Sequence, residues 1–180
     1  MKMNKAIFLD RDGVINYSFV KDGKPYPPDT LEDFRFYEDV EESLNKLKSL
    51  GYLLVIVTNQ PDVATGKQTR ETVESMHRLI NLKLPIDFIK VCYETDGPDC
   101  HCYKPKPGML LEARSEMNID ITQSYMIGDR WRDIGAGQNA GCKQSILIER
   151  DYAEKNIYLA DFICKSLTEA VTYIIEQDLN

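Results

Sequence analysis

The chain has 180 residues, 43% of them hydrophobic and 28% charged, a composition typical of one globular domain. The formal charge of −7 argues against general affinity for nucleic acid or anionic lipid. The sequence contains no apolar run of membrane-spanning length and no apolar stretch like that of a secretory signal. We therefore expect a cytoplasmic protein, monomeric and without nucleic-acid or membrane partners, with a single domain over residues 1–180.

Hydrophobic periodicity predicts alternating strands and helices. In chain order, these are a strand at 6–9, a helix at 39–50, a strand at 52–57, a helix at 69–82, a strand at 87–92, a helix at 107–118, a strand at 124–127, a helix at 133–140, strands at 144–148 and 161–163, and a helix at 166–177. This alternation predicts an α/β fold, a mostly parallel sheet with helices on both faces. Ligands of such sheets bind at the carboxyl ends of the strands.

Two segments interrupt the alternation, at about 16–36 and 94–107. Both are rich in polar residues, proline and glycine, and each follows a predicted strand. Long irregular loops in a compact domain are usually functional. We expect both to lie over the ligand-binding edge as short lids.

Polar groups follow several of the predicted strands. Asp10 and Asp12 follow the first strand, Asp129 and Asp133 follow the strand at 124–127, and Thr58 follows the strand at 52–57. Each has an ordinary alternative: a solvated loop, a helix cap or a turn. Paired carboxylates suit a hard cation such as Mg²⁺, and a free hydroxyl with backbone N–H groups suits a phosphate.

A lysine stands in the proline-stiffened segment CYKPKPGM, just before a predicted helix. Lys104 could neutralise a phosphate or a carboxylate there; Lys106 is the competing candidate, and a surface lysine is the ordinary alternative. Carboxylates, a hydroxyl and a lysine gathered at one sheet edge predict magnesium-assisted phosphoryl chemistry.

The order of these motifs resembles the haloacid dehalogenase superfamily. D-x-D-G-V at 10–14 is followed by a strand ending in T-N, then by K-P, then by G-D-x-x-x-D at 128–133. With C-x-C-x-K-P-x-P-G-M at 100–109, the chain is similar to the histidinol-phosphate and heptose-bisphosphate phosphatase branch. The resemblance implies a Rossmann-like fold, and the chain length leaves no room for a large cap domain.

The resemblance also implies catalytic roles. Asp10 would be the nucleophile that forms an aspartyl-phosphate, and Asp12 the general acid and then the general base. Thr58 and Lys104 would bind the phosphoryl group and balance its charge. The predicted activity is a Mg²⁺-dependent phosphomonoesterase acting on a small sugar phosphate, such as a heptose phosphate or bisphosphate.

Magnesium would be held by the Asp10 carboxylate, the Asp12 carbonyl and Asp129. Asp133 would not bind the ion directly but would support these ligands or bind the ion through a water molecule. Substrate contacts are expected from Asn59, Gln60, Tyr103 and Lys104. Tyr103 departs from the branch, where many members carry arginine before the motif lysine. Tyrosine cannot pair bidentately with a second phosphate, and the candidates to compensate are Lys21, Lys24, Lys67 and Arg130.

Three of the five cysteines cluster within eleven residues, Cys92, Cys100 and Cys102. An odd count without a secretory signal argues against a disulfide framework. The branch often carries a zinc loop, C-x-H-x(n)-C-x-C, but Glu94 occupies the histidine position here. His101 or Glu94 would then be the fourth ligand of a structural Zn²⁺. The alternative is a loop with three reduced cysteines and no metal.

Other functions compete with the sugar phosphatase. A histidinol-phosphate phosphatase shares the same motifs. A nucleic-acid 3′-phosphatase is disfavoured by the net charge. A non-catalytic phospho-acceptor module would place its aspartate after the third strand, whereas Asp10 follows the first. A degenerate member would have lost a core catalytic position, and every one is filled.

Overall fold

The computed structural model describes residues 3–179 and is built on a six-stranded parallel sheet. In spatial order the strands are β5 (Phe88–Cys92), β4 (Leu53–Asn59), β1 (Ala6–Leu9), β6 (Tyr125–Gly128), β7 (Gln144–Ile148) and β8 (Phe162–Cys164). Both central strands, β1 and β6, are buried along their whole length, which explains their continuous apolar sequences. The predicted fold class is confirmed.

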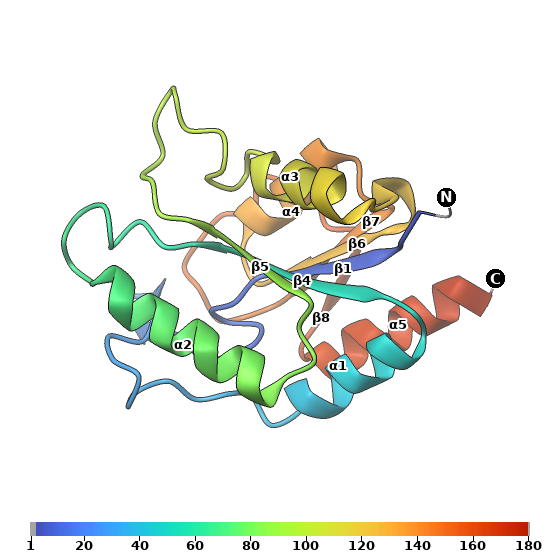
Figure 1. Ribbon diagram of the computed structural model, residues 1–180, viewed down its shortest axis with the longest axis horizontal. Helices are drawn as coiled ribbons and strands as arrows, with labels where there is room; N and C mark the ends of the chain where they lie inside the picture. The colour runs from blue at the N-terminus through green and yellow to red at the C-terminus, as the bar shows by residue number, and fades with distance from the viewer. Residues whose placement is uncertain (1–2, 180) are drawn as a thin grey trace.

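Five helices cover the two faces of the sheet (Figure 1). One face packs against α1 (Val40–Ser49), α2 (Arg70–Lys83) and α5 (Leu167–Leu179), and the other against α3 (Gly108–Met117) and α4 (Trp131–Ala140). A short 3-10 helix, η1 (Ile121–Gln123), precedes β6. No helix of the described residues is both long and apolar enough to cross a membrane.

The chain enters the sheet at its centre and reverses direction there. From β1 it builds outward through β4 to β5, then returns to the other side of β1 and builds outward again through β6, β7 and β8. The loops after the neighbouring strands β1 and β6 therefore diverge at the carboxyl ends of these strands. In parallel sheets such a reversal leaves a crevice in which ligands bind.

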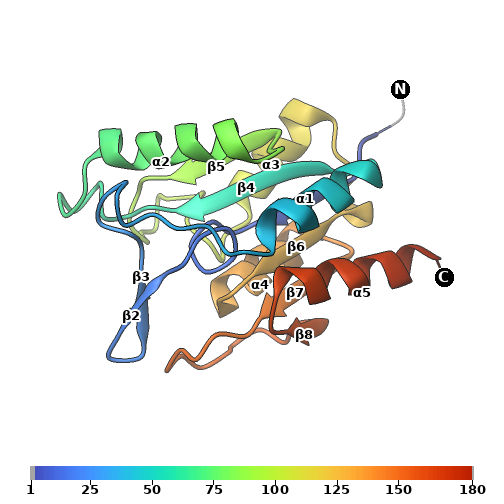
Figure 2. The same ribbon diagram turned by 90° about the horizontal axis from the view of Figure 1, so that it is seen from below.

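The segment 16–36 is not wholly irregular, and in this respect the expectation was wrong. It contains an antiparallel hairpin of β2 (Phe19–Lys21) and β3 (Lys24–Tyr26), which projects away from the sheet (Figure 2). Asp22 and Gly23 form its turn with positive φ angles of 52° and 72°. Asp-Gly is a strong signal for a two-residue hairpin turn, and it is present in the sequence.

Candidate active site

Lys104 is buried at the carboxyl ends of the central strands. Its ammonium donates to Asp10 Oδ1 at 2.8 Å, Asp133 Oδ1 at 2.6 Å and the Val57 carbonyl at 2.8 Å, which uses all three of its N–H bonds. Burial lowers the pKa of Lys104, but the charges of Asp10 and Asp133 outweigh it and raise that pKa above its usual value. The lysine is thus a fixed cation between two carboxylates.

Three buried carboxylates converge around this lysine. Asp10, Asp129 and Asp133 each offer an oxygen, and these oxygens lie within 4.8 Å of one another. Burial and the charge of Asp133 raise the pKa of Asp10 to about 6, although Lys104 opposes the shift. Burial and the charge of Asp10 raise the pKa of Asp129 well above its usual value. One lysine does not balance this charge, so the site favours a further cation.

The surroundings of Asp129 fit a hard divalent cation. Its Oδ2 accepts a hydrogen bond of 2.6 Å from the Tyr152 hydroxyl, while its buried Oδ1 has no hydrogen-bond partner. Gly13, at φ +89°, lies against the same carboxylate, and a Cβ there would lie 1.8 Å from Oδ2. An unpartnered buried oxygen is costly. A cation such as Mg²⁺, which binds carboxylate oxygens, would satisfy it.

The second aspartate of the first motif is clamped by its neighbour. Arg11 donates from Nη2 to both oxygens of Asp12 at 2.9 Å, and Asn16 and Gln60 donate to the same carboxylate at 2.9 and 2.8 Å. Arg11 is itself fully buried and contacts His77 Nε2 at 3.2 Å. Asp12 is therefore held in one orientation at the cavity wall.

The residues at the end of β4 support the site more than they line it. Gln60 is 1% exposed, bridges Asp12 and the Thr58 hydroxyl, and is not among the described residues that line the cavity. Asn59 lines the cavity, but its amide bonds the backbone of Lys104 in both directions, at 3.1 and 3.3 Å. Asp133 likewise caps α4 through the Arg130 N–H at 3.0 Å.

A cavity of about 200 Å³ opens over Asp10, Asp12 and Lys104. The hairpin contributes Pro25 and Tyr26 to its wall, so the segment 16–36 does reach the site. The remaining lining residues are Ser18, Pro27, Asn59, Pro61, Asp62, Tyr103, Asp129, Arg130, Arg132 and Asp133. Of the four cations expected to compensate for Tyr103, only Arg130 is among the described residues that line it.

Several residues that hold or line the site have no role in the sequence motifs. Arg11, Tyr152 and Arg132 contact the aspartates or the cavity wall from positions that no motif role covered. Arg11 lies inside the D-x-D motif, and a long cationic side chain between two aspartates indicates that it could pair with one of them. Tyr152 follows β7 in a segment with no periodicity, and nothing in the sequence connects it with Asp129.

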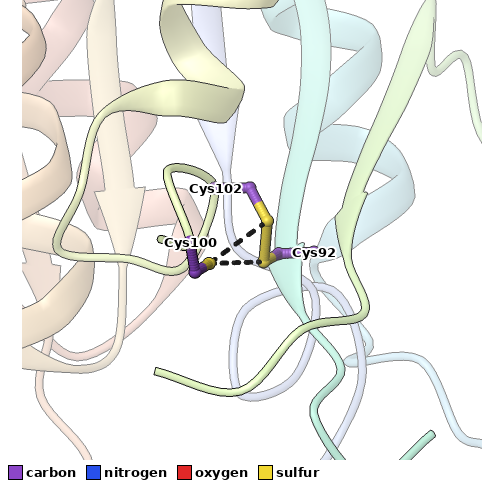
Figure 3. A group of neighbouring side chains, drawn as sticks. All are labelled: Cys92, Cys100 and Cys102. Atoms are coloured by element: carbon purple, nitrogen blue, oxygen red, sulfur yellow. Dashed lines mark hydrogen bonds between the residues drawn. A yellow bond between two sulfur atoms is a disulfide. The ribbon is translucent and has the colours of Figure 1, made fainter. Parts of the chain in front are cut away.

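The cysteine cluster joins the last residue of β5, Cys92, to the segment that follows this strand (Figure 3). Cys92 and Cys102 form a disulfide, with Cα atoms 5.5 Å apart, and the Cys100 sulfur lies 3.8 and 3.7 Å from their sulfurs. This pairing differs from the expectation of three thiols, whether zinc-bound or free, because the loop folds back and brings Cys102 against the end of β5. Among the described residues, neither His101 nor Glu94 belongs to the group of three cysteines that could hold a metal ion.

Known proteins similar to this chain share both its sequence and its fold. Residues 24–147 match the model of the haloacid dehalogenase-like hydrolases. A D-glycero-beta-D-manno-heptose-1,7-bisphosphate 7-phosphatase of Haemophilus influenzae is 37% identical over 93% of this chain and 95% of its own. Its Helicobacter pylori counterpart is 38% identical over 82% of this chain and 86% of its own.

A solved structure agrees in fold. The D,D-heptose 1,7-bisphosphate phosphatase of B. bronchiseptica, solved with magnesium and phosphate, has a TM-score of 0.80 at 23% identity, covering 96% of this chain and 99% of that one. The fold and the sequence relatives define the class, and the chain is a phosphoric monoester hydrolase. It belongs to the haloacid dehalogenase-like hydrolase family.

Proposed function

We propose that this phosphatase hydrolyses a phosphorylated sugar, and that its substrate is D-glycero-D-manno-heptose 1,7-bisphosphate or a close analogue. The observation that carries the proposal is the buried Asp10–Lys104–Asp133 ion network at the base of a small open cavity. The named relatives, which align over nearly the whole chain, support the choice of substrate.

In the first step Asp10 attacks phosphorus. Lys104 holds Oδ1 of Asp10, which leaves the second oxygen to form the new bond as the bond from phosphorus to the sugar oxygen breaks. Asp12 gives its proton to the departing oxygen. Its orientation by Arg11 and Gln60 provides the fixed geometry that general acid catalysis requires.

In the second step water releases the phosphate. Asp12, now ionised, takes a proton from the water as the water oxygen attacks phosphorus, and the bond between phosphorus and the Asp10 oxygen breaks. The Lys104 ammonium and the Thr58 hydroxyl stabilise the charge on the phosphoryl oxygens. Both carboxylates then return to their starting states.

Asp10, the Asp12 carbonyl and Asp129 would hold Mg²⁺, and Asp133 would support them through Lys104. A bound Mg²⁺ screens the repulsion between the nucleophile and the phosphate dianion. It would also favour ionised Asp10, whose pKa is otherwise raised to about 6 by burial and the charge of Asp133. We expect activity to need the divalent cation for both reasons.

We further propose that Cys92, Cys100 and Cys102 bind structural Zn²⁺ when the loop is reduced. Zinc is bound by thiolates, so the disulfide between Cys92 and Cys102 must open first. The support is the proximity of the three sulfurs, within 4.8 Å of one another.

Phosphate release from the heptose bisphosphate, with Mg²⁺ and then with chelator, tests the enzyme assignment. We expect Asp10→Asn to abolish turnover and Asp12→Asn to reduce kcat by about a hundredfold or more. Asp151→Asn, an exposed aspartate outside the cavity, is the matched control and should retain wild-type activity. Turnover near the wild-type rate in Asp10→Asn would refute the proposed nucleophile.

A further inference from the structure

The cavity wall carries more positive charge than the chemistry at Asp10 uses. Among the described residues that line it, the cationic side chains are Lys104, Arg130 and Arg132. Lys104 points inward and spends its three N–H bonds on Asp10, Asp133 and a backbone carbonyl. The two arginines are therefore the cations that an anion farther out in the cavity could meet.

Arg130 is already paired. Its Nε donates to Glu154 Oε2 at 3.0 Å, and its Nη2 contacts the other oxygen of the same carboxylate. Burial lowers the pKa of Arg130, but Glu154 outweighs it and raises that pKa above its usual value. This two-point pairing occupies one edge of the guanidinium and neutralises its charge.

Arg132 is held mainly by aromatic rings. Its guanidinium carbon lies 4.5 Å from the centre of the Trp131 ring and 5.3 Å from the centre of the Tyr103 ring, and its side chain is 25% exposed. A guanidinium that stacks through its faces keeps its N–H edges available for a phosphate. Trp131 is itself stacked on Tyr158, which steadies this support.

The carboxylate beside Arg132 binds it weakly. Arg132 Nη1 lies 3.5 Å from Asp96, which is 49% exposed and also pairs with Lys106 at 3.3 Å. Exposed ion pairs of this length contribute little free energy, so an incoming phosphate would displace Asp96 at small cost. Arg132 also lies in the first turn of α4, where the helix dipole disfavours a cation and favours an anion nearby.

We propose that Arg132 binds a second phosphate of the substrate, at the end of the sugar remote from the ester being hydrolysed. The inference rests on the proposed function, because it assumes that the first phosphate meets Asp10. The positive charge that binds this second phosphate thus comes from α4, and the ring of Tyr103 supports the Arg132 guanidinium. Arg132 would thus select bisphosphorylated over monophosphorylated sugars.

Steady-state kinetics of Arg132→Ala on two substrates test this assignment. For heptose 1,7-bisphosphate, we expect KM to rise about tenfold or more, as for loss of a charge-assisted hydrogen bond, with kcat changed less than twofold. For p-nitrophenyl phosphate, which has no second phosphate, we expect kcat/KM to stay at the wild-type value. Arg132→Lys, which keeps the charge without the fork, should fall between the two.

The matched control is Arg114→Ala, which removes an exposed arginine of α3 outside the cavity and should leave both substrates unaffected. Arg132→Gln gives the same readout if the alanine variant unfolds. An unchanged KM for the bisphosphate, or equal losses on both substrates, would overturn the inference. If the wild-type enzyme with Mg²⁺ hydrolysed neither of the two substrates, the proposed function would be refuted instead.

Discussion

At the scale of single residues, the orientation of Asp12, the proposed general acid, depends on two buried side chains, Arg11 and His77. Arg11 clamps Asp12, and His77, from α2, receives a hydrogen bond from Arg11 through its Nε2 at 3.2 Å. Only a neutral imidazole can accept that bond. Burial and the charge of Arg11 lower the pKa of His77 to about 4, so the ring stays neutral throughout the range in which a phosphatase works.

This pair predicts a pH-dependent loss of stability. Between the usual value of 6.5 and the folded pKa of about 4, the unfolded chain takes up a proton at His77 and the folded chain does not. Stability is therefore lost as the pH falls through that window, by about 3 kcal/mol in total for a shift of this size. We expect His77→Gln, which retains a side-chain oxygen acceptor, to remove this part of the loss.

Urea unfolding of both proteins from pH 7 to pH 4 measures the effect. The difference between the two curves isolates His77 from the carboxylates; Asp10 acts in the opposite direction, because its folded pKa of about 6 lies above its usual value. Parallel losses of stability in both proteins would show that His77 carries no proton linkage.

At the scale of elements, the sheet could be predicted from the sequence, but the position of the β2–β3 hairpin relative to the sheet could not. The inner strands β1, β4 and β6 appear in the sequence as apolar runs separated by helical periodicity, because helices bury them. The hairpin of β2 and β3 has mostly exposed residues, so its strands carry no such pattern. Its one local signal, Asp22-Gly23, marks a turn but not the elements that the hairpin approaches.

The cysteine loop after β5 is the element whose chemistry the sequence left open. The odd count of cysteines argued for thiols, yet Cys92 and Cys102 are joined and Cys100 lies beside both sulfurs. Pairing depends on how the nine residues between these two cysteines fold back, which spacing alone does not determine. The loop therefore has two candidate states, disulfide-bonded and reduced.

We predict that the reduced loop binds one Zn²⁺ per chain and that the oxidised loop binds none. Zinc competition with a chromogenic chelator, before and after treatment with a phosphine reductant, measures this. Cys100→Ser should weaken zinc binding strongly because it removes one of three thiolates. Cys142→Ser, which alters a cysteine outside the cluster, should bind as the wild type does, and equal zinc binding by the oxidised chain would contradict the prediction.

At the scale of the whole molecule, the site is a product of topology. Residues 10, 58, 104 and 129 come from four separate segments, with residue 133 in α4 just after the last of them, and the reversal between β1 and β6 brings them together. Their convergence could be predicted, because parallel strands with right-handed crossovers end at one edge. The side chains that hold these residues could not be predicted. Tyr152 bonds Asp129 across 23 residues and His77 contacts Arg11 across 66 residues, and no periodicity of the sequence links either pair.

The same topology concentrates negative charge in the interior of an already acidic chain. Asp10, Asp129 and Asp133 converge, and the buried Lys104 pairs with two of them, Asp10 and Asp133. Burial and like charge raise the pKa of both Asp10 and Asp129. This repulsion opposes folding when no divalent cation is bound. A ligand that binds only the folded state stabilises it in proportion to the logarithm of its concentration.

Asp129→Asn should therefore stabilise the metal-free protein while abolishing its response to magnesium. The amide removes one buried charge and keeps an oxygen that can accept the Tyr152 hydrogen bond, now made to Asp129 Oδ2 at 2.6 Å. Thermal unfolding in chelator should give a Tm about 2–4 °C above the wild type for each kcal/mol of repulsion relieved. Added Mg²⁺ should raise the Tm of the wild type but not of the variant. A variant less stable than the wild type in chelator, yet equally stabilised by Mg²⁺, would show that Asp129 is a structural residue whose charge the fold tolerates without a cation.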